Sequence, residues 1–380
     1  MFENFKNILN KSQAEQFLKN EIPNSLWKIT NALTSENFDI FLVGGSVRDS
    51  FISKTPKDFD LATNALPDEV MKSLDKHNIK STPRGVEFGV VVANVDNEEF
   101  EIATFREDVS GGTGNLMDDK VELGVSIETD VKRRDLTINA LFFNLKTNEI
   151  VDLVGGIDDM KNNVINTVGD PKERFKEDST RKLRSIRFSA QMDFNISNEI
   201  KNEIKKDPLL KCNNERIMLE LDKIFDPNRN KDMMKSALLM EELGLIEQIF
   251  KGCKTKKIET DVISLTTFIA NVLVEDRDNL GDAFDIFLSV DIQRAVLSLW
   301  MLSDLDNNEP IDIIRTMNGV KLSGEEIKSF TNDNRALRFL DREGIQKSIK
   351  KFNLEAIEYG LKGKDIGDYT KDKIRELMLK

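Results

Sequence analysis

The sequence predicts an α+β protein, in which a small mixed part of strands and helices comes first and helices alone make up the remainder. Two observations predict this class. Short β-prone runs at 40–43, 88–95 and 99–105 are bounded by glycine or polar turn residues, and from about Lys172 onward apolar positions recur only at helical spacing. Because 380 residues exceed the usual size of one hydrophobic core, we expect three units, namely residues 1–152, 153–230 and 231–380.

The first part of the chain is expected to alternate strands, turns and short helices. The apolar run 40–43 ends at Gly44 and Gly45, and a helix is expected from Val47 to about Ile52. Asp96-Asn97 is typical of a hairpin turn between the two later runs. The other elements expected here are a strand at 58–62, a loop with three glycines at 109–120, a helix near 136–143 and a strand near 150–153.

The second part is expected to be helical throughout, with no strand after about Lys172. Its apolar spacing predicts helices over 175–192, 197–206, 214–225 and 231–249, and several more after residue 260.

Composition indicates an ordinary globular protein, with 39% hydrophobic and 32% charged residues. The only two cysteines, Cys212 and Cys253, form no CxxC motif, which argues against a disulfide framework or a zinc site and favours a cytoplasmic location. The first fifteen residues lack the apolar core of a secretory signal, and the longest apolar stretch, 263–274, is too short to span a bilayer. We therefore expect no membrane association, and nothing indicates an obligate protein partner.

The net charge of −12 argues at first against a nucleic-acid partner, because lysine and arginine normally bind its phosphates. The acidic residues are unevenly distributed, however. Residues 151–230 contain equal numbers of basic and acidic side chains, and within them 172–187 carries seven basic against three acidic residues. A local stripe of this kind allows one surface to contact nucleic acid.

Asp58 and Asp60 form the first candidate site. Residues i and i+2 of a strand point to the same face, so the expected strand at 58–62 presents both carboxylates together. Two carboxylate oxygens suit Mg²⁺, which binds proteins through one or two carboxylates and completes its shell with substrate phosphates. An isolated Asp-x-Asp is also typical of a solvated turn, so the pair needs support from its surroundings.

The Gly44-Gly45 pair provides that support. Small residues between the end of a strand and the start of a helix let a triphosphate approach backbone N–H groups, and Arg48 adds a charge-assisted fork for phosphate oxygens. Gly45 and Arg48 are therefore candidate nucleotide-binding residues. The alternative is a tight turn beside a surface arginine, and the GxxxxGK[ST] pattern of a P-loop is absent.

FLVGGSVRD followed by KDFDLAT resembles the signature of the DNA polymerase β superfamily, in the tRNA nucleotidyltransferase/poly(A) polymerase family that holds the class II CCA-adding enzymes. The resemblance implies a polymerase β-like nucleotidyltransferase head followed by a helical neck, body and tail. It also implies that Asp58 and Asp60 are the catalytic metal ligands and that Gly45 and Arg48 contact the nucleotide. The family often has a third acidic residue on a neighbouring strand, for which Glu101 is a candidate.

The stretch RRDLTINA at 133–140 resembles the family's RRD[FL]TINA motif. The resemblance implies that Arg134 contacts the nucleotide and that Asp135 is associated with the ribose. Because adjacent arginines cannot share a helix face, we expect one of Arg133 and Arg134 to meet phosphate and the other to form a structural ion pair.

Asp178 and Arg181 are candidates for reading the base. On the predicted helix they are neighbours at i and i+3, and the alternative role is a local salt bridge. Cytosine and adenine each present an amino group beside a ring-nitrogen acceptor, so a carboxylate and a guanidinium pair with either, whereas uracil and guanine present the opposite pattern. The pair matches the EDxxR motif of the family, and the resemblance places Arg184 and Arg187 near the nucleotide phosphates.

The resemblance implies an enzyme that adds CCA to the 3′ end of tRNA from CTP and ATP, uses Mg²⁺, releases pyrophosphate and binds the acceptor arm by shape. Poly(A) polymerase activity or partial addition of CC or A is the alternative within the family, and the loop at 109–120 favours full CCA addition. A non-catalytic RNA-binding relative would be expected to lose a metal carboxylate. A small-molecule nucleotidyltransferase has no need of the Asp178 and Arg181 pair.

Overall fold

The computed structural model describes residues 8–85, 88–109, 121–250, 253, 255–273, 290–318, 320–331 and 333–379. The chain forms two compact units, Met1–Asn213 and Asn214–Lys380. The three-part division at 152 and 230 stays a prediction. The expected loop at 109–120 lies, except for Val109, outside the described residues.

The first unit is built on a seven-stranded sheet with strand order β3-β4-β5-β2-β1-β8-β9. Neighbouring strands are antiparallel except β2 and β5, which are parallel. The strands are β1 (Ile40–Val43), β2 (Leu61–Thr63), β3 (Lys80–Pro83), β4 (Val90–Val95), β5 (Glu98–Thr104), β8 (Phe142–Asn144) and β9 (Glu149–Val151). Two small ribbons pair β6 (Arg106–Asp108) with β7 (Val121–Leu123), and β10 (Val164–Ile165) with β11 (Asn195–Ile196).

The hairpin of β4 and β5 turns as the sequence predicts. Asp96 and Asn97 both have positive φ, 53° and 67°, which is the backbone of a tight two-residue hairpin turn. The prediction of strands at 40–43 and near 150–153 is also confirmed by β1 and β9.

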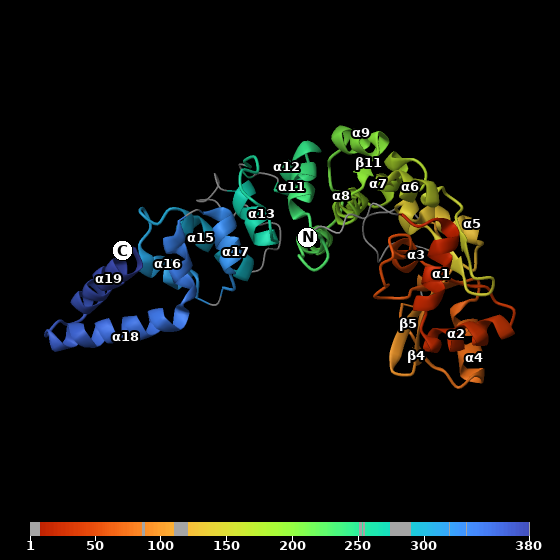
Figure 1. Cartoon of the computed structure of the whole chain (residues 1–380), viewed down its shortest axis with the longest axis horizontal. Coiled ribbons are helices and arrows are strands. Elements are labelled where there is room, and N and C mark those ends of the chain that lie inside the picture. Colours follow the sequence, from red (N-terminus) through yellow and green to blue (C-terminus); the bar gives the residue numbers. More distant parts are fainter. Residues whose placement is uncertain are drawn as a thin grey trace. The chain divides into compact units, whose positions relative to one another are not determined.

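Helices cover part of this sheet. α2 (Asn24–Ser35) and α4 (Pro67–Lys76) contact each other and β4, as Figure 1 shows in red and orange. Leu26, Ile29 and Leu33 recur every three or four residues on α2 and are fully buried, so one apolar stripe faces inward. α1 (Lys11–Glu21) contacts α3 (Gly45–Ser50) and β9.

Three phenylalanine rings fill a second part of the core. Phe41 of β1, Phe105 and Phe142 of β8 pack with ring centroids 5.8 to 6.3 Å apart. All three are at most 6% exposed. Since Phe41 and Phe142 lie on adjacent strands, this cluster fixes β8 beside β1 and thereby the segment that leads into β8.

Three predicted helices are wrong, and one of them, over 231–249, is divided into α11 (Met233–Glu242) and α12 (Ile246–Ile249). Residues 136–143 form the 3₁₀ turn η4 (Thr137–Asn139) and then enter β8, because this short apolar segment is buried in the sheet. The helix expected over 175–192 is two helices, α7 (Pro171–Glu177) and α8 (Thr180–Met192), separated at Asp178 and Ser179. The expected absence of strands after Lys172 is also wrong, since β11 pairs with β10.

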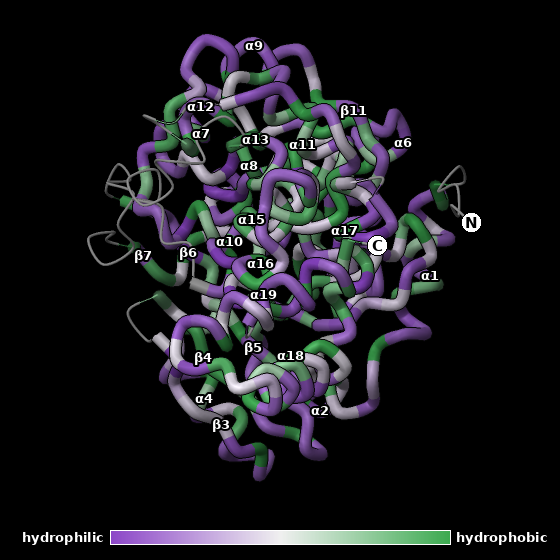
Figure 2. Tube along the Cα trace, turned by 90° about the vertical axis from the view of Figure 1, so that its left-hand side faces the viewer, coloured by the Kyte–Doolittle hydropathy of each residue, from purple (hydrophilic) through white to green (hydrophobic). Residues whose placement is uncertain are grey.

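Further helices complete the first unit: α5 (Ile127–Asp130), η3 (Val131–Arg133), α6 (Gly156–Asn162) and α9 (Asn198–Lys206). α9 is drawn mainly in the hydrophilic colour of Figure 2 and buries Ile200 and Ile204. These two residues are four apart and give the helix its single inward stripe.

The described part of the second unit contains helices and no strand, as predicted. Phe268 of α13 stacks on Phe225 at 4.3 Å between ring centroids, and the indole N–H of Trp300 donates to the carbonyl of Ala270 at 2.8 Å. No described helix has the length and apolar character needed to cross a membrane. The helices are α10 (Asn214–Ile224), α11 (Met233–Glu242), α12 (Ile246–Ile249), α13 (Leu265–Val272), α15 (Val290–Ser303), α16 (Pro310–Thr316), α17 (Gly324–Phe330), η6 (Asn334–Leu340), α18 (Arg342–Glu358) and α19 (Lys364–Leu379).

Candidate nucleotide-binding site

The turn after β1 has the backbone that only glycine adopts without strain. Gly44 has φ 69° and ψ −122° and precedes α3, which begins at Gly45. A Cβ added to Gly45 would lie 3.7 Å from the nearest atom, the Nη2 of Arg48, which is an ordinary contact. The fold therefore requires glycine at 44, whereas at 45 it leaves room in front of the helix.

This difference predicts that alanine at 44 lowers the stability of the fold, whereas alanine at 45 affects nucleotide binding. Gly44→Ala is expected to destabilise the protein by about 2 kcal/mol because of backbone strain. Gly45→Ala is expected to change stability by less than about 0.5 kcal/mol, yet to weaken CTP binding because its methyl group projects where a phosphate would approach. Chemical denaturation and equilibrium CTP binding measure the two effects, and unchanged CTP affinity in Gly45→Ala would contradict the placement.

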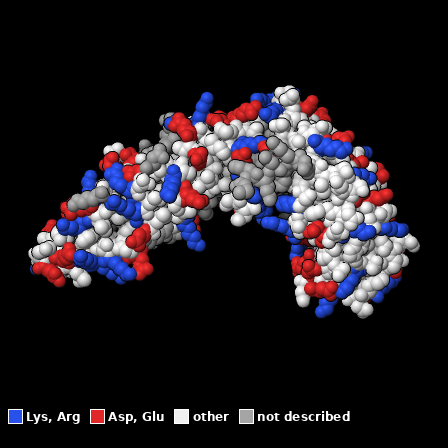
Figure 3. Space-filling model, viewed as in Figure 1, with Lys and Arg blue, Asp and Glu red and all other residues white. Residues whose placement is uncertain are grey.

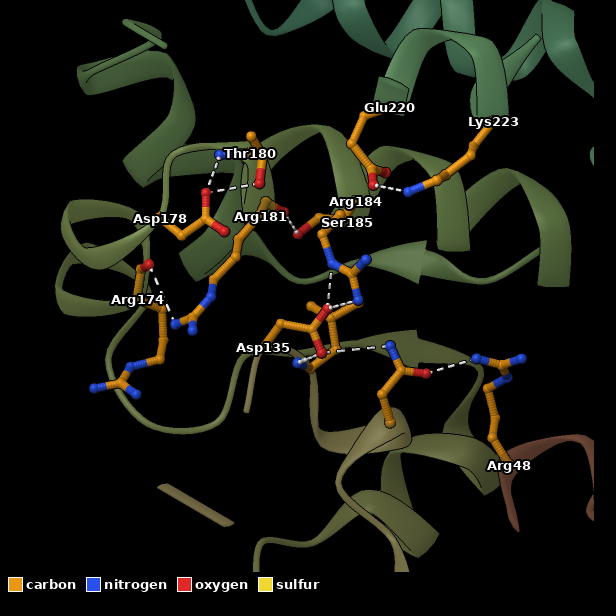
Figure 4. A network of polar contacts seen from close by, with 12 residues as sticks. Arg48, Asp135, Arg174, Asp178, Thr180, Arg181, Arg184, Ser185, Glu220 and Lys223 are labelled. Atoms are coloured by element: carbon orange, nitrogen blue, oxygen red, sulfur yellow. Dashed lines mark hydrogen bonds and ion pairs between the residues drawn. The ribbon is translucent and has the colours of Figure 1, made fainter. Parts of the chain in front are cut away.

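Arg48 lies on α3, at the edge of the polar network that contains Asp135 and Arg184 (Figure 4). Its Nε donates to Asp49 Oδ1 at 2.9 Å, and its Nη1 donates to Asn139 Oδ1 at 2.6 Å. Only 12% of its side chain is exposed. The guanidinium is thus fixed from two sides before any ligand arrives.

Asp58 and Asp60 lie just before β2, which begins at Leu61, so the prediction that Asp58 and Asp60 are part of this strand is wrong. Both residues are exposed. The carbonyl of Asp60 nevertheless accepts a hydrogen bond from the Val43 N–H at 3.0 Å, which continues the pairing with β1. Asp60 therefore lies directly beside the strand end that leads into Gly44.

Glu101 belongs to the same group of carboxylates. Leu61 is opposite Ile102 in the parallel pair of β2 and β5, so the preceding residues Asp60 and Glu101 are also neighbours. The Glu101 carboxylate accepts from Arg84 Nη1 at 2.8 Å.

The pKa of Asp60 is raised, first because surrounding protein displaces water and then because Glu101 and Asp58 are negative, while Arg134 opposes the shift. Asp60 is still exposed, so ions reach it. Within the described residues, no three acidic, histidine or cysteine side chains form a group able to hold a metal ion by themselves. Crowded carboxylates without a complete shell fit a divalent cation that takes further oxygens from a substrate.

The two arginines of the RRD stretch share one buried carboxylate. Arg133 and Arg134 bind different oxygens of Asp130, at 2.8 Å and 2.9 Å. The prediction that only one of them forms an ion pair is therefore wrong. Burial opposes ionisation of Asp130, but the two guanidinium groups and the Arg106 N–H outweigh it and hold its pKa below the ordinary value.

Asp135 connects the RRD stretch to α8. Its Oδ2 accepts from Arg184 Nε at 2.6 Å, and its Oδ1 accepts from the Leu136 N–H at 2.7 Å. Burial opposes its ionisation, but Arg184 and these hydrogen bonds together lower its pKa. Asp135 therefore carries its negative charge in the folded protein, next to an arginine that is 49 residues away in the sequence.

Asp178 and Arg181 lie at the break between α7 and α8. The Asp178 carboxylate accepts from the N–H and hydroxyl of Thr180, the first residue of α8, at 3.0 and 2.6 Å (Figure 4). Arg181 donates to Glu177 Oε2 at 2.8 Å and to the Arg133 carbonyl at 2.7 Å. Both side chains are thus positioned by the start of α8 instead of by the continuous helix that we predicted.

Phe188 brings three of the predicted arginines together. The guanidinium carbons of Arg187, Arg48 and Arg184 lie 4.3, 4.9 and 5.7 Å from the centre of its ring. Phe188 is 7% exposed. Cation–π contacts with this one ring bring three guanidinium groups together, and a cluster of positive groups is favourable for binding a polyanion.

Comparison with known proteins shows what the chain is similar to. The model of the poly(A) polymerase head domain matches residues 40–166. The CCA-adding enzyme of Lactobacillus helveticus (strain DPC 4571) is 29% identical over 92% of this chain and 91% of its own length. Residues 40–166 are thus similar to the poly(A) polymerase head domain, and the chain as a whole is similar to CCA-adding enzymes.

The CCA-adding enzyme of Pediococcus pentosaceus is 37% identical over 56% of this chain. That alignment spans about half of the relative, 54% of its length, and the one with the Enterococcus faecalis CCA-adding enzyme spans 48% of that enzyme.

Solved structures show the same fold. The apo form I of a CCA-adding enzyme aligns with a TM-score of 0.66 at 21% identity and covers 96% of this chain and 93% of its own. The Bacillus stearothermophilus CCA-adding enzyme with CTP aligns with a TM-score of 0.56 at 22% identity and covers 93% and 82%. The α+β prediction is confirmed.

Three contributors to the candidate site were not predicted as such: Asp130, Asn139 and Phe188. Asp130 precedes Arg133 and Arg134 by three and four residues, a spacing that itself indicates ion pairing on a helical turn. Asn139 stands in the RRDLTINA stretch, but its bond to Arg48, 91 residues away, is not visible in the sequence, and neither is the contact of Phe188 with Arg48.

Two other features lie apart from these residues. A cavity of about 350 Å³ is lined by Thr137, Asp159, Asn166 and Glu199 among others, and none of the predicted site residues lines it. On the face shown in Figure 3, basic and acidic side chains are interspersed over the surface.

Proposed function

We propose that the protein adds C, C and A to the 3′ end of tRNA without a template, from CTP and ATP, and releases pyrophosphate. One observation carries the proposal: the Val43 N–H to Asp60 carbonyl hydrogen bond, 3.0 Å long, sets the carboxylates beside the Gly44-Gly45 turn. Triphosphate-binding groups and metal-binding groups are therefore adjacent, as nucleotidyl transfer requires. The relatives named CCA-adding enzymes support tRNA as the acceptor.

We propose that Asp58 and Asp60 hold Mg²⁺. When bound, the cation activates the attacking 3′-hydroxyl and stabilises the charge of the leaving pyrophosphate. The chain itself supplies the remaining functions. Arg48, Arg184 and Arg187 bind the phosphates around Phe188. Arg134 adds charge near Asp60, to which it is electrostatically coupled, and Asp135 contacts the ribose.

Asp178 and Arg181 are proposed to select the base, by exchanging their present contacts for the edge of cytosine or adenine. Asp178→Ala is then expected to lower the preference for CTP over UTP about tenfold, equivalent to one lost charge-assisted hydrogen bond. The matched control is Thr180→Val, which removes the hydroxyl contact of Asp178 at 2.6 Å but leaves the carboxylate. Competition between the two nucleotides measures the preference, and an unchanged ratio in Asp178→Ala would refute base reading.

Competing functions receive less support. A non-catalytic RNA-binding relative is disfavoured because both carboxylates are present and exposed. The matching head-domain model is named after poly(A) polymerase, so the match of the head does not distinguish poly(A) addition from CCA addition. The low cysteine content favours a reducing compartment, and we propose that the protein acts in the cytoplasm.

The test is incubation of the protein with Mg²⁺, CTP, ATP and a tRNA that lacks its last three nucleotides. The expected product carries CCA at its 3′ end and no further nucleotides. Sequencing of the extended ends identifies it, and a long run of A would instead indicate poly(A) polymerase activity.

A further inference from the structure

Asn139 lies between two residues of the proposed nucleotide site. Its side-chain oxygen accepts from Arg48 Nη1 at 2.6 Å, and its side-chain nitrogen donates to Asp135 Oδ1 at 3.5 Å. The residue is 9% exposed and belongs to the 3₁₀ turn η4. Asn139 is thus the link between Asp135 and Arg48.

An amide is suited to this position because its two ends have opposite character. Arg48 offers only donors, so the group facing it has to accept, and ionised Asp135 offers only acceptors, so the group facing it has to donate. A carboxylate at 139 would repel Asp135, and an aliphatic side chain would leave both neighbours without this partner.

The link extends to α8. Asp135 Oδ2 accepts from Arg184 Nε at 2.6 Å, so the order of contacts is Arg48, Asn139, Asp135 and Arg184. Arg48 and Arg184 also face the same ring of Phe188, at 4.9 and 5.7 Å. The phosphate-binding and ribose-binding groups are thereby joined through one buried side chain.

We propose that Asn139 is a positioning residue, which sets the Arg48 guanidinium and the Asp135 carboxylate in one orientation for the triphosphate and the ribose. This inference rests on the proposed function, because it takes Arg48 and Asp135 as nucleotide contacts. Asn139 itself contacts neither reacting atoms nor metal. Its contribution is to lower the cost of ordering these two side chains when the nucleotide binds.

Two substitutions test different halves of the link. Asn139→Leu is nearly the same size and removes both hydrogen bonds, so we expect the Kd for CTP to rise about tenfold, or about 1.4 kcal/mol. Asn139→Asp keeps an acceptor for Arg48 but repels Asp135. We expect it to lower the preference for CTP over dCTP about fivefold, with a smaller change in CTP affinity.

Asn166→Leu is the matched control. The Asn166 amide also donates to a carboxylate, Asp159 Oδ1 at 2.7 Å, but faces the separate cavity. We expect this variant to lose similar stability and to bind CTP like the wild type. Equilibrium binding of CTP and dCTP, without tRNA, is measured for all four proteins, and thermal melting shows that each is folded.

The outcomes separate the two levels of the proposal. If Asn139→Leu and Asn139→Asp bind CTP and dCTP like the wild type, or if Asn166→Leu shows the same loss, the positioning role is overturned and the proposed function stands. If the wild type binds neither nucleotide, both are overturned. If Asn139→Leu does not fold, the isosteric Asn139→Asp variant tests the positioning role. A lowered preference for CTP over dCTP supports that role, and an unchanged preference overturns it.

Discussion

Replacing Asp60 with alanine is expected to lower the rate of nucleotide addition about a thousandfold, with little change in folding. A bound metal ion lowers the free energy of the charged transition state by several kcal/mol. Losing about 4 kcal/mol of this stabilisation slows the reaction about a thousandfold. Asp60 is exposed and its side chain is crowded by negative neighbours, so its removal relieves repulsion and costs the fold little. Asp58→Ala is expected to behave in the same way.

The control for these variants is Glu99→Gln on β5. Glu99 is exposed, and its carboxylate lies 3.6 Å from Arg84. The Glu99→Gln variant should add nucleotides at a rate within about twofold of the wild type. Glu101→Gln tests the third carboxylate, since a strong loss would add it to the metal ligands. Addition rates are measured at saturating Mg²⁺ and again after chelation with EDTA. An Asp60→Ala protein that keeps more than a tenth of the wild-type rate would refute the metal site.

Replacing Asp130 with alanine is expected to give the largest loss of stability. Its side chain is 1% exposed and is the shared partner of Arg133 and Arg134. Removing one partner of a buried ion pair leaves charge uncompensated and costs about 3 to 5 kcal/mol. For a unit of this size, the loss corresponds to a fall in Tm of about 10 °C.

The matched control is Asp158→Ala, because Asp158 is 78% exposed and its ion pair with Lys161 is on the surface. Its Tm should change by less than about 2 °C. The lowered pKa of Asp130 adds a pH dependence. The carboxylate stabilises the fold at neutral pH, and that contribution is lost as the pH falls through the folded-state pKa. A Tm for Asp130→Ala within 2 °C of the wild type would contradict the role of this carboxylate.

Strands β1, β4 and β5 of the first unit could be predicted because their signals are local. The run 40–43 is continuously apolar, and Asp96-Asn97 supplies the positive φ of a hairpin turn. The sequence of residues 136–143 does not decide between helix and strand, because a short apolar segment is compatible with a buried strand as well as with a helix. Tertiary packing of Phe142 against Phe41 decides for the strand.

The predicted helix over 175–192 fails at one residue for a physical reason. The Asp178 side chain binds the N–H of Thr180, so it competes with the helical hydrogen bonds and starts a new helix. The candidate residues themselves were identifiable, since Arg48, Asp135 and Arg184 stand in motifs. Their connection was not, because Arg48 and Asn139 are 91 residues apart and only the folded sheet brings them together.

The central claim, ordered addition of CCA, is tested most directly with single nucleotides. On a tRNA that lacks its last three nucleotides, CTP alone should add two residues and stop, whereas ATP, UTP or GTP alone should add none. On a tRNA that ends in CC, ATP should add one residue and stop. Sequencing of the 3′ ends distinguishes these products. A long tail of A with ATP alone, or no addition with CTP, would contradict the account.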